Sequence, residues 1–197
     1  MMTKLDAYLA TLPSGLGSFG DCRAKGSLVR ASLALKPLRA TSALPPELVQ
    51  YVARPPLVSE WVPETHYVGL SLAIADEYGF DRESFREFWR GVMHSLTDGM
   101  YSTLLGLAHP ETLVRGTAAR WAHFHQGTHV SAARENGQFI VRFVMPTGLF
   151  PDLLIDGYAG VLQGLIDRSR KPEGRASRGP VTTEGAKTVA TYLLAGW

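Results

Sequence analysis

The sequence is short of several features that would place a protein in a class at once. Cys22 is the single cysteine in 197 residues, which excludes an intramolecular disulfide and any zinc or iron–sulfur site built from several cysteines of one chain. Charged residues make up only 19% of the chain and the formal net charge is +2, so neither long disordered segments nor nucleic-acid binding is indicated. No apolar run approaches the roughly 18 residues that a membrane span needs, and residues 1–8 do not resemble a secretory signal. We expect a soluble, cytoplasmic protein.

Motifs that would identify a reaction are also missing. The sequence contains no G-x-S-x-G elbow, no H-E-x-x-H pair and no P-loop. Gly15-Leu-Gly-Ser-Phe-Gly20 does spell G-x-G-x-x-G, but Pro13 and Ser14 precede it and no helical pattern follows, so the context for dinucleotide binding is absent. We expect a protein without catalytic residues or a cofactor, and therefore not an enzyme.

The clearest structural signal is Asn136-Gly137, which lies between two segments rich in strand-forming residues. Asn and Gly tolerate the positive φ angles of a type I′ turn, whose twist matches that of paired strands. In the second strand, alternate residues are apolar and share one face; these are Phe139, Val141, Phe143 and Met145. A helix is predicted on each side of the hairpin, over 110–126 and over 151–168.

Helices also account for the first half of the chain. The patterns predict helices over 46–53, over 63–78 with Gly79 closing it, and from Asp81 as N-cap to about residue 104, with a kink or break at 97–99. Residues 27–35 are apolar and fit either a strand or a short helix. Residues 1–27 are rich in glycine, and we interpret them as a flexible leader.

The C-terminus predicts a second hairpin, with strands over 176–182 and 187–197. The fold class expected is α+β: a helical N-terminal half, then helix–hairpin–helix–hairpin forming a four-stranded antiparallel sheet packed by helices. Residues 28–197 are expected to form one sensor-like domain.

Three glycines, Gly157, Gly160 and Gly164, lie near one another on the helix predicted after the first hairpin. Glycine inside a helix costs about 1 kcal/mol relative to alanine. We expect these glycines to form a packing face that lets a sheet or a second helix approach closely. The second helix could belong to another copy of the chain, which would make the face a homodimer contact.

This order of elements, with the final strand ending at Trp197, resembles the ligand-binding fold shared by haem–NO-binding domains, TRAPP trafficking subunits and 4-vinyl-reductase-like domains. Within that group the chain is similar to a Myxococcus-type paralogous family of unknown function. The resemblance is carried by residues 88–116, the Asn136-Gly137 hairpin, the helix through Gly160 and the last strand. It implies a small-molecule sensor or interaction domain, often dimeric. The Tyr-x-Ser-x-Arg motif of the haem-binding members is absent from this sequence, and Cys22 lies outside the matched region.

Aromatic residues at helical spacing are usually core, but some could line a ligand pocket between helices and sheet. If such a pocket exists, the residues expected to form it are Trp89, Met93, Trp121, His125 and Tyr158. Trp121 and His125 would lie one turn apart on the helix that enters the hairpin, with His125 as the polar tip.

The segment from His123 to His129 holds three histidines, but His123 and His125 would point in opposite directions on a helix, and no third ligand is placed by spacing. We predict no metal site there. A basic loop over residues 168–178 is interpreted as solvated rather than as a nucleic-acid contact.

Three functions follow as hypotheses. The first is a non-enzymatic sensory or adaptor domain that binds a small apolar ligand, a protein partner, or both. The second is an assembly module that acts as a homodimer without a ligand. The third is a metal-dependent enzyme that uses the histidine cluster.

Overall fold

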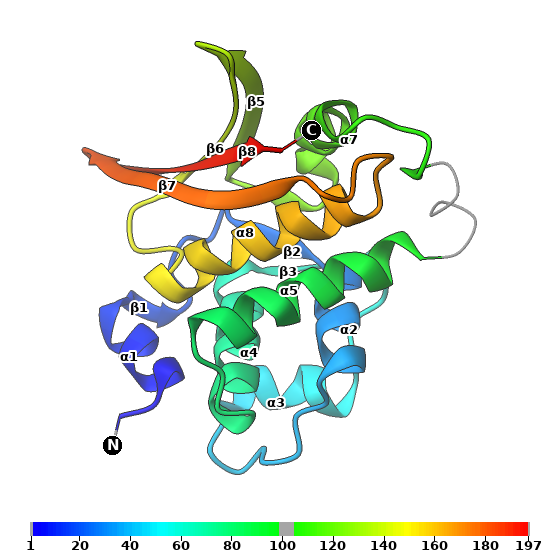
Figure 1. The fold of residues 1–197 in the computed structure, drawn as a ribbon. Coiled ribbons are helices and arrows are strands. Elements are labelled where there is room, and N and C mark those ends of the chain that lie inside the picture. The colour runs from blue at the N-terminus through cyan, green and yellow to red at the C-terminus, as the bar shows by residue number, and fades with distance from the viewer. Residues whose placement is uncertain (1, 99–104, 197) are drawn as a thin grey trace.

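The computed structural model describes residues 2–98 and 105–196 (Figure 1). It consists of a helical part and a curved four-stranded sheet, with helix α8 (Asp152–Asp167) running between the two. The predicted α+β class is confirmed. Among the described residues, no helix is both long enough and apolar enough to cross a membrane.

The helical part is built around helix α4 (Glu64–Glu77), in which every residue from Thr65 to Ala75 except the half-buried His66 is buried. It begins at Glu64, one residue after the predicted start at Pro63, which is the N-cap; Gly79 has a φ of 64° just after its end, as the sequence predicted. The surrounding helices are α1 (Lys4–Thr11), α2 (Gly26–Leu35), α3 (Pro46–Ala53) and α5 (Arg82–Thr97). Asp81 caps α5 in a capping box with Ser84, and the predicted continuation of this helix to residue 104 falls largely outside the described residues.

Residues 1–27 differ from the flexible leader that their glycines suggested. Helix α1 packs its buried Leu5 and Tyr8 into the core, and strand β1 (Pro13–Leu16) follows it. Strand β2 (Arg23–Lys25) is the middle of a small sheet with β3 (Trp61–Pro63) and β4 (His125–Gln126). This sheet joins three segments that are far apart in the sequence, and strands of two or three residues carry no periodicity from which pairing could be predicted.

The larger sheet has the order β5-β6-β8-β7 and is antiparallel throughout. Its strands are β5 (His129–Glu135), β6 (Gln138–Pro146), β7 (Arg175–Glu184) and β8 (Lys187–Ala195). Asn136 and Gly137 have φ angles of 47° and 81°, which confirms the type I′ turn. The four alternate apolar residues predicted to share a face of β6 are all buried.

The helix predicted over 110–126 is shorter than expected. Helix α7 (Pro110–Ala119) ends at Arg120, a single 3-10 turn η1 (Trp121–His123) follows, and the chain then enters β4. The sequence predicted a longer helix because Trp121, Phe124 and His125 still lie at helical spacing. In the structure, pairing of β4 with β2 instead gives His125 and Gln126 an extended backbone.

The three glycines of α8 lie against α5 of the same chain. A Cβ added at Gly160 would lie 2.0 Å from the carbonyl oxygen of Arg86, and one at Gly157 would lie 2.5 Å from the ring of Trp89. Glycine therefore allows two 16-residue helices to approach closely. The stripe faces α5 and is not open to a second copy of the chain, so the homodimer version of this packing face does not hold.

Candidate functional site

The predicted pocket residues come together in one aromatic cluster between α5, α8 and the large sheet. The ring of Trp121 stacks on that of His125 with 4.0 Å between centroids and 11° between planes. Tyr158 lies edge-on to Trp121 at 5.9 Å and stacks with Trp89 at 6.3 Å. Met93 lies one turn further along α5, where it packs against Gly164. The rings fill the space between them.

Trp121 and His125 reach this contact by a different route from the one predicted. They do not lie one turn apart on a helix, because Trp121 is in η1 and His125 is in β4. Strand β4 turns the imidazole back under the indole, and Trp121 Nε1 donates a hydrogen bond of 2.9 Å to Thr128 Oγ1. The Trp121 indole is thus held by Thr128 at its N–H edge and by the His125 ring against one face.

A buried carboxylate–imidazole pair lies at the centre of the cluster, and the sequence did not predict it. Glu64 is completely buried, and His125 is 4% exposed. His125 Nδ1 lies 3.1 Å from both carboxylate oxygens of Glu64. In the sequence, Glu64 is only an acidic residue near the start of a predicted helix, where the helix dipole favours a negative charge. Its partner is 61 residues away in the sequence, so no local pattern could have indicated the pair.

Three tyrosines and the single cysteine surround this carboxylate. Burial raises the pKa values of the Tyr8, Tyr67 and Tyr158 hydroxyls, and the negative charge of Glu64 raises them further. Burial, with the same carboxylate as the second cause, raises the pKa of the Cys22 thiol to about 11. All four groups are therefore neutral at physiological pH, which leaves Cys22 unreactive as a nucleophile.

Two polar atoms of the cluster have no hydrogen-bond partner among the described residues. They are the hydroxyl of Tyr158 and Nε1 of Trp89, which belong to side chains that are 4% and 3% exposed. A buried polar group without a partner costs about 1–3 kcal/mol. Such groups are uncommon in folded proteins and call for a reason.

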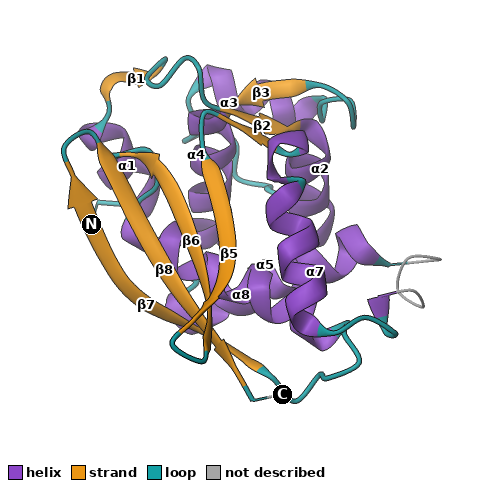
Figure 2. Ribbon diagram, turned by 90° about the horizontal axis from the view of Figure 1, so that it is seen from above, coloured by secondary structure: helices purple, strands orange, loops and turns teal. Residues whose placement is uncertain are grey.

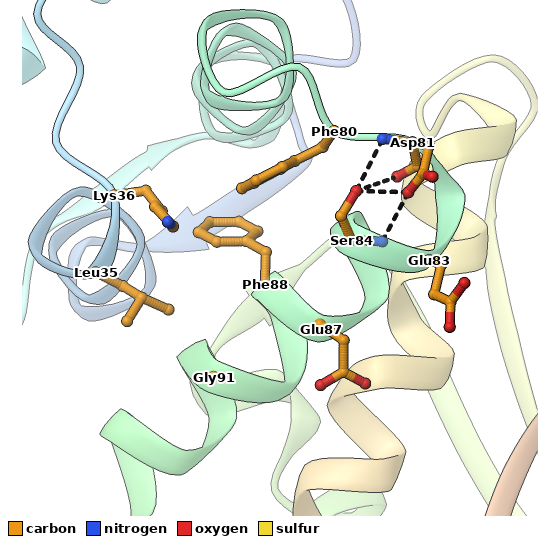
Figure 3. Close-up of a pocket in the computed structure, with 9 residues that line it drawn as sticks. All are labelled: Leu35, Lys36, Phe80, Asp81, Glu83, Ser84, Glu87, Phe88 and Gly91. Carbon is orange, nitrogen blue, oxygen red and sulfur yellow. Dashed lines mark hydrogen bonds between the residues drawn. The ribbon is translucent and has the colours of Figure 1, made fainter.

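Open grooves lie on the surface around this core. Figure 3 shows the groove between α2 and α5, of about 570 Å³, where Phe80 and Phe88 lie side by side. Its cation is Lys36, whose Nζ lies 4.7 Å from the ring centroid of Tyr78. An apolar groove of about 740 Å³ lies beside α1 and the start of α8, and one of about 520 Å³ lies between α7 and β5. Trp121 forms part of the wall of this last groove, so one side chain separates it from the buried pair.

The three histidines of the His123–His129 segment do not converge on one point. His123 and His129 are exposed whereas His125 is buried. No group of three or more histidine, cysteine or carboxylate side chains able to hold a metal ion was found in the described parts of the chain. In the basic loop, Arg168, Lys171 and Arg178 form ion pairs with carboxylates of the same chain, at Asp98, Glu173 and Asp152. The third hypothesis thus has no supporting site among these residues.

Comparisons with known proteins identify the fold but not a family. No family model matches the chain, and no curated protein matches it. The chain is similar to solved H-NOX structures. These include an oxygen-binding H-NOX domain related to soluble guanylate cyclases (10% identity, TM-score 0.56, 86% of this chain and 90% of that chain). A structure from work on haem distortion in the H-NOX family matches with 12% identity, a TM-score of 0.60, and 86% and 93% coverage. One from work on H-NOX activation matches with 9% identity, a TM-score of 0.57, and 86% and 92% coverage.

Among the described residues, the buried histidine His125 is not free to ligate a haem. A haem requires an axial ligand that faces a flat open slot. His125 is the buried histidine among the described residues, but Glu64 engages its Nδ1 and Trp121 covers one face of its ring at 4.0 Å. The ring of Tyr67 lies 6.2 Å away. The chain therefore has the H-NOX fold, with its own aromatic rings packed around a carboxylate–imidazole pair.

Proposed function

We propose that the protein is a non-enzymatic, cytoplasmic sensory or adaptor domain that binds a small apolar ligand in the aromatic cluster and communicates with a protein partner. The fold shared with H-NOX structures supports a sensory role. The observation that carries the proposal is the unpartnered Tyr158 hydroxyl beside the buried Glu64–His125 pair.

The ligand that this site suits is planar, mostly apolar and carries one hydrogen-bond acceptor. Aromatic rings on several sides favour a flat apolar body. An acceptor within reach of the Tyr158 hydroxyl would satisfy a donor that has no partner among the described residues. The buried carboxylate disfavours a ligand with a second negative charge.

Entry to the cluster requires Trp121 to move. The groove on the outer side of Trp121 is lined by alanines and so leaves room for the indole; they are Ala118, Ala119, Ala122 and Ala132. The hydrogen bond to Thr128 would have to break, at a net cost of about 1 kcal/mol. A ligand could therefore couple its own binding to the geometry of η1 and β5.

A matched pair of probes tests the proposal. Quinoline and naphthalene have nearly the same shape, but only quinoline carries an acceptor nitrogen. We expect quinoline to raise the melting temperature more than naphthalene does at equal concentration, and we expect the difference to vanish in Tyr158→Phe. Stabilisation by quinoline should change in Trp121→Ala and stay the same in Trp61→Ala, because Trp61 packs under the ammonium of Lys25 and is not one of the rings of the cluster. If neither compound stabilises the protein, or if Trp121→Ala leaves the stabilisation as it was, the site is wrong.

An assembly module that forms a homodimer without a ligand is the second candidate. The glycine stripe cannot be its interface, because α5 covers it. Sedimentation velocity of the full chain at micromolar concentration would decide this point: a stable dimer supports the candidate, and a monomer excludes it.

A further inference from the structure

The two edges of the large sheet are unlike each other. Edge strand β7 contains Pro180 and a register shift between Arg178 and Val181, both of which discourage pairing with another strand. Edge strand β5 has neither device: its seven residues pair with β6 in one continuous register, from His129 opposite Val144 to the turn. Figure 2 shows β5 at the side of the sheet that faces α7, and β7 at the opposite side.

The backbone of β5 presents unpaired groups along this edge. The two-residue turn makes Glu135 and Gln138 a hydrogen-bonded pair, and such pairs alternate along an antiparallel ladder. The N–H and C=O groups of Val130, Ala132 and Arg134 therefore point away from β6. Within the described residues these groups form no backbone hydrogen bond to another segment.

A groove runs along the same edge. Its volume is about 520 Å³, and it lies between the last turns of α7 and strand β5. Alanines line much of it, and no carboxylate is among its lining residues. Arg115 is exposed at one side, with its guanidinium 5.2 Å above the ring of Phe139, and His129 is exposed on the strand. The groove is thus lined largely by small side chains, with the exposed Arg115 beside it and the Arg134–Glu111 ion pair joining β5 to α7.

We propose that this edge binds an extended acidic segment of a partner protein, which adds to β5 as a fifth strand of the sheet. Strand addition would use the outward backbone groups of Val130, Ala132 and Arg134 for affinity. On the face of the added strand that points toward α7, an acidic side chain would meet Arg115 and medium-sized apolar side chains would fill the space left by the alanines. The inference names the partner of the proposed adaptor role, and it does not need a ligand in the aromatic cluster.

The position of Trp121 connects this edge to the core. The same indole lines the groove and stacks on His125, so a partner at β5 and a ligand in the cluster would contact the same side chain. Trp121 also supplies a fluorescence signal for occupation of the groove.

The probe is a seven-residue peptide, acetylated and amidated at its ends, in which glutamate and valine alternate along the face toward α7 and threonine occupies the other face. With the full chain, we expect the amide hydrogens of Val130, Ala132 and Arg134 to exchange freely without the probe and to become at least about tenfold more protected with it. The amides of His129, Ser131 and Ala133 are already bonded to β6 and should change little. No protection at millimolar probe, or equal protection on both sets, would overturn the proposal.

Protein variants separate backbone pairing from charge. Ala132→Pro removes an outward N–H and leaves the bonds to β6, whereas Arg115→Glu reverses the charge beside the groove. Each should weaken binding about tenfold or more, because each removes a contact of the complex. Arg120→Glu is the matched control, since Arg120 is also exposed at the end of α7 but does not line the groove. Unchanged affinity in Ala132→Pro, or loss in Arg120→Glu equal to that in Arg115→Glu, contradicts the assignment.

Two further probes keep the test decisive if Ala132→Pro does not fold. A probe with N-methyl groups on alternate residues cannot pair as a strand and should not bind. A probe with lysine in place of glutamate should bind at least about tenfold more weakly. Binding of the methylated probe would refute strand addition, and equal binding of the lysine probe would refute the acidic partner.

The quinoline test and the peptide test are independent of each other. A failure of quinoline to stabilise the protein leaves the strand-addition result unaffected. Absence of peptide binding leaves the aromatic cluster as it is.

Discussion

His125→Phe is expected to be among the most destabilising single substitutions in this protein. Phenylalanine is close to histidine in size and keeps the stack on Trp121, whose ring lies 4.0 Å from that of His125. The substitution therefore removes little packing, but it leaves the carboxylate of Glu64 fully buried without its partner. For a pair in which both groups are ionised, removing one partner costs about 3–5 kcal/mol, and this is the charge state that the substitution tests.

The size of the chain converts this cost into a measurable shift. For a domain of this length, each kcal/mol changes the melting temperature by roughly 2–4 °C, so the expected loss is about 6–20 °C. The assay is thermal and urea unfolding at neutral pH, followed by circular dichroism. His123→Phe is the control, because His123 is exposed in the same turn and its replacement should change stability by no more than about 0.5 kcal/mol.

A second substitution tests the cause. Glu64→Gln in the His125→Phe background removes the unpaired charge, so the double variant should recover part of the lost stability. If His125→Phe costs less than about 1 kcal/mol, or if the two losses simply add, Glu64 is not held by His125 as an ionised partner and the account of the buried pair fails.

Three other outcomes are expected. Gly160→Ala should destabilise the protein by about 1–3 kcal/mol in urea unfolding, since its Cβ would meet the Arg86 carbonyl, whereas Gly116→Ala in α7, where the nearest such atom is 3.8 Å away, should be neutral or stabilising. Cys22 should react with iodoacetamide in native protein far more slowly than in urea at neutral pH, because burial raises its pKa to about 11; equal rates would contradict its burial. Burial lowers the pKa of His66, so the unfolded state binds more protons near pH 6. Stability measured by urea titration should accordingly fall as pH drops below about 6.5, and His66→Phe should reduce this dependence.

Local signals predicted the elements whose residues interact mainly with near neighbours. The type I′ turn follows from the backbone preferences of Asn136 and Gly137, and α4 follows from Pro63 before it and Gly79 after it. Close packing of α8 was also implied by its glycines, because internal glycine in a helix needs a reason.

Long-range pairing decided what the sequence left open or suggested wrongly. The small β3-β2-β4 sheet draws its strands from three distant segments. Its formation places part of the glycine-rich N-terminal stretch in the core, and it ends helix α7 at Ala119, earlier than the apolar pattern predicted. The candidate site shows the same limit. Trp121, His125 and Tyr158 could be named from their chemistry, but Glu64 could not, because an acidic residue at a helix start is usually exposed.

The sequence by itself therefore determined the α+β class, the central hairpin and the absence of the known catalytic motifs, since these depend on composition and on periodicities of two and 3.6 residues. Only the tertiary structure decided that α5 covers the glycine stripe, that Glu64 and His125 meet in the core, and that the edge of β5 stays open. Each of these depends on contacts between residues tens of positions apart, and such contacts leave no local pattern in the chain.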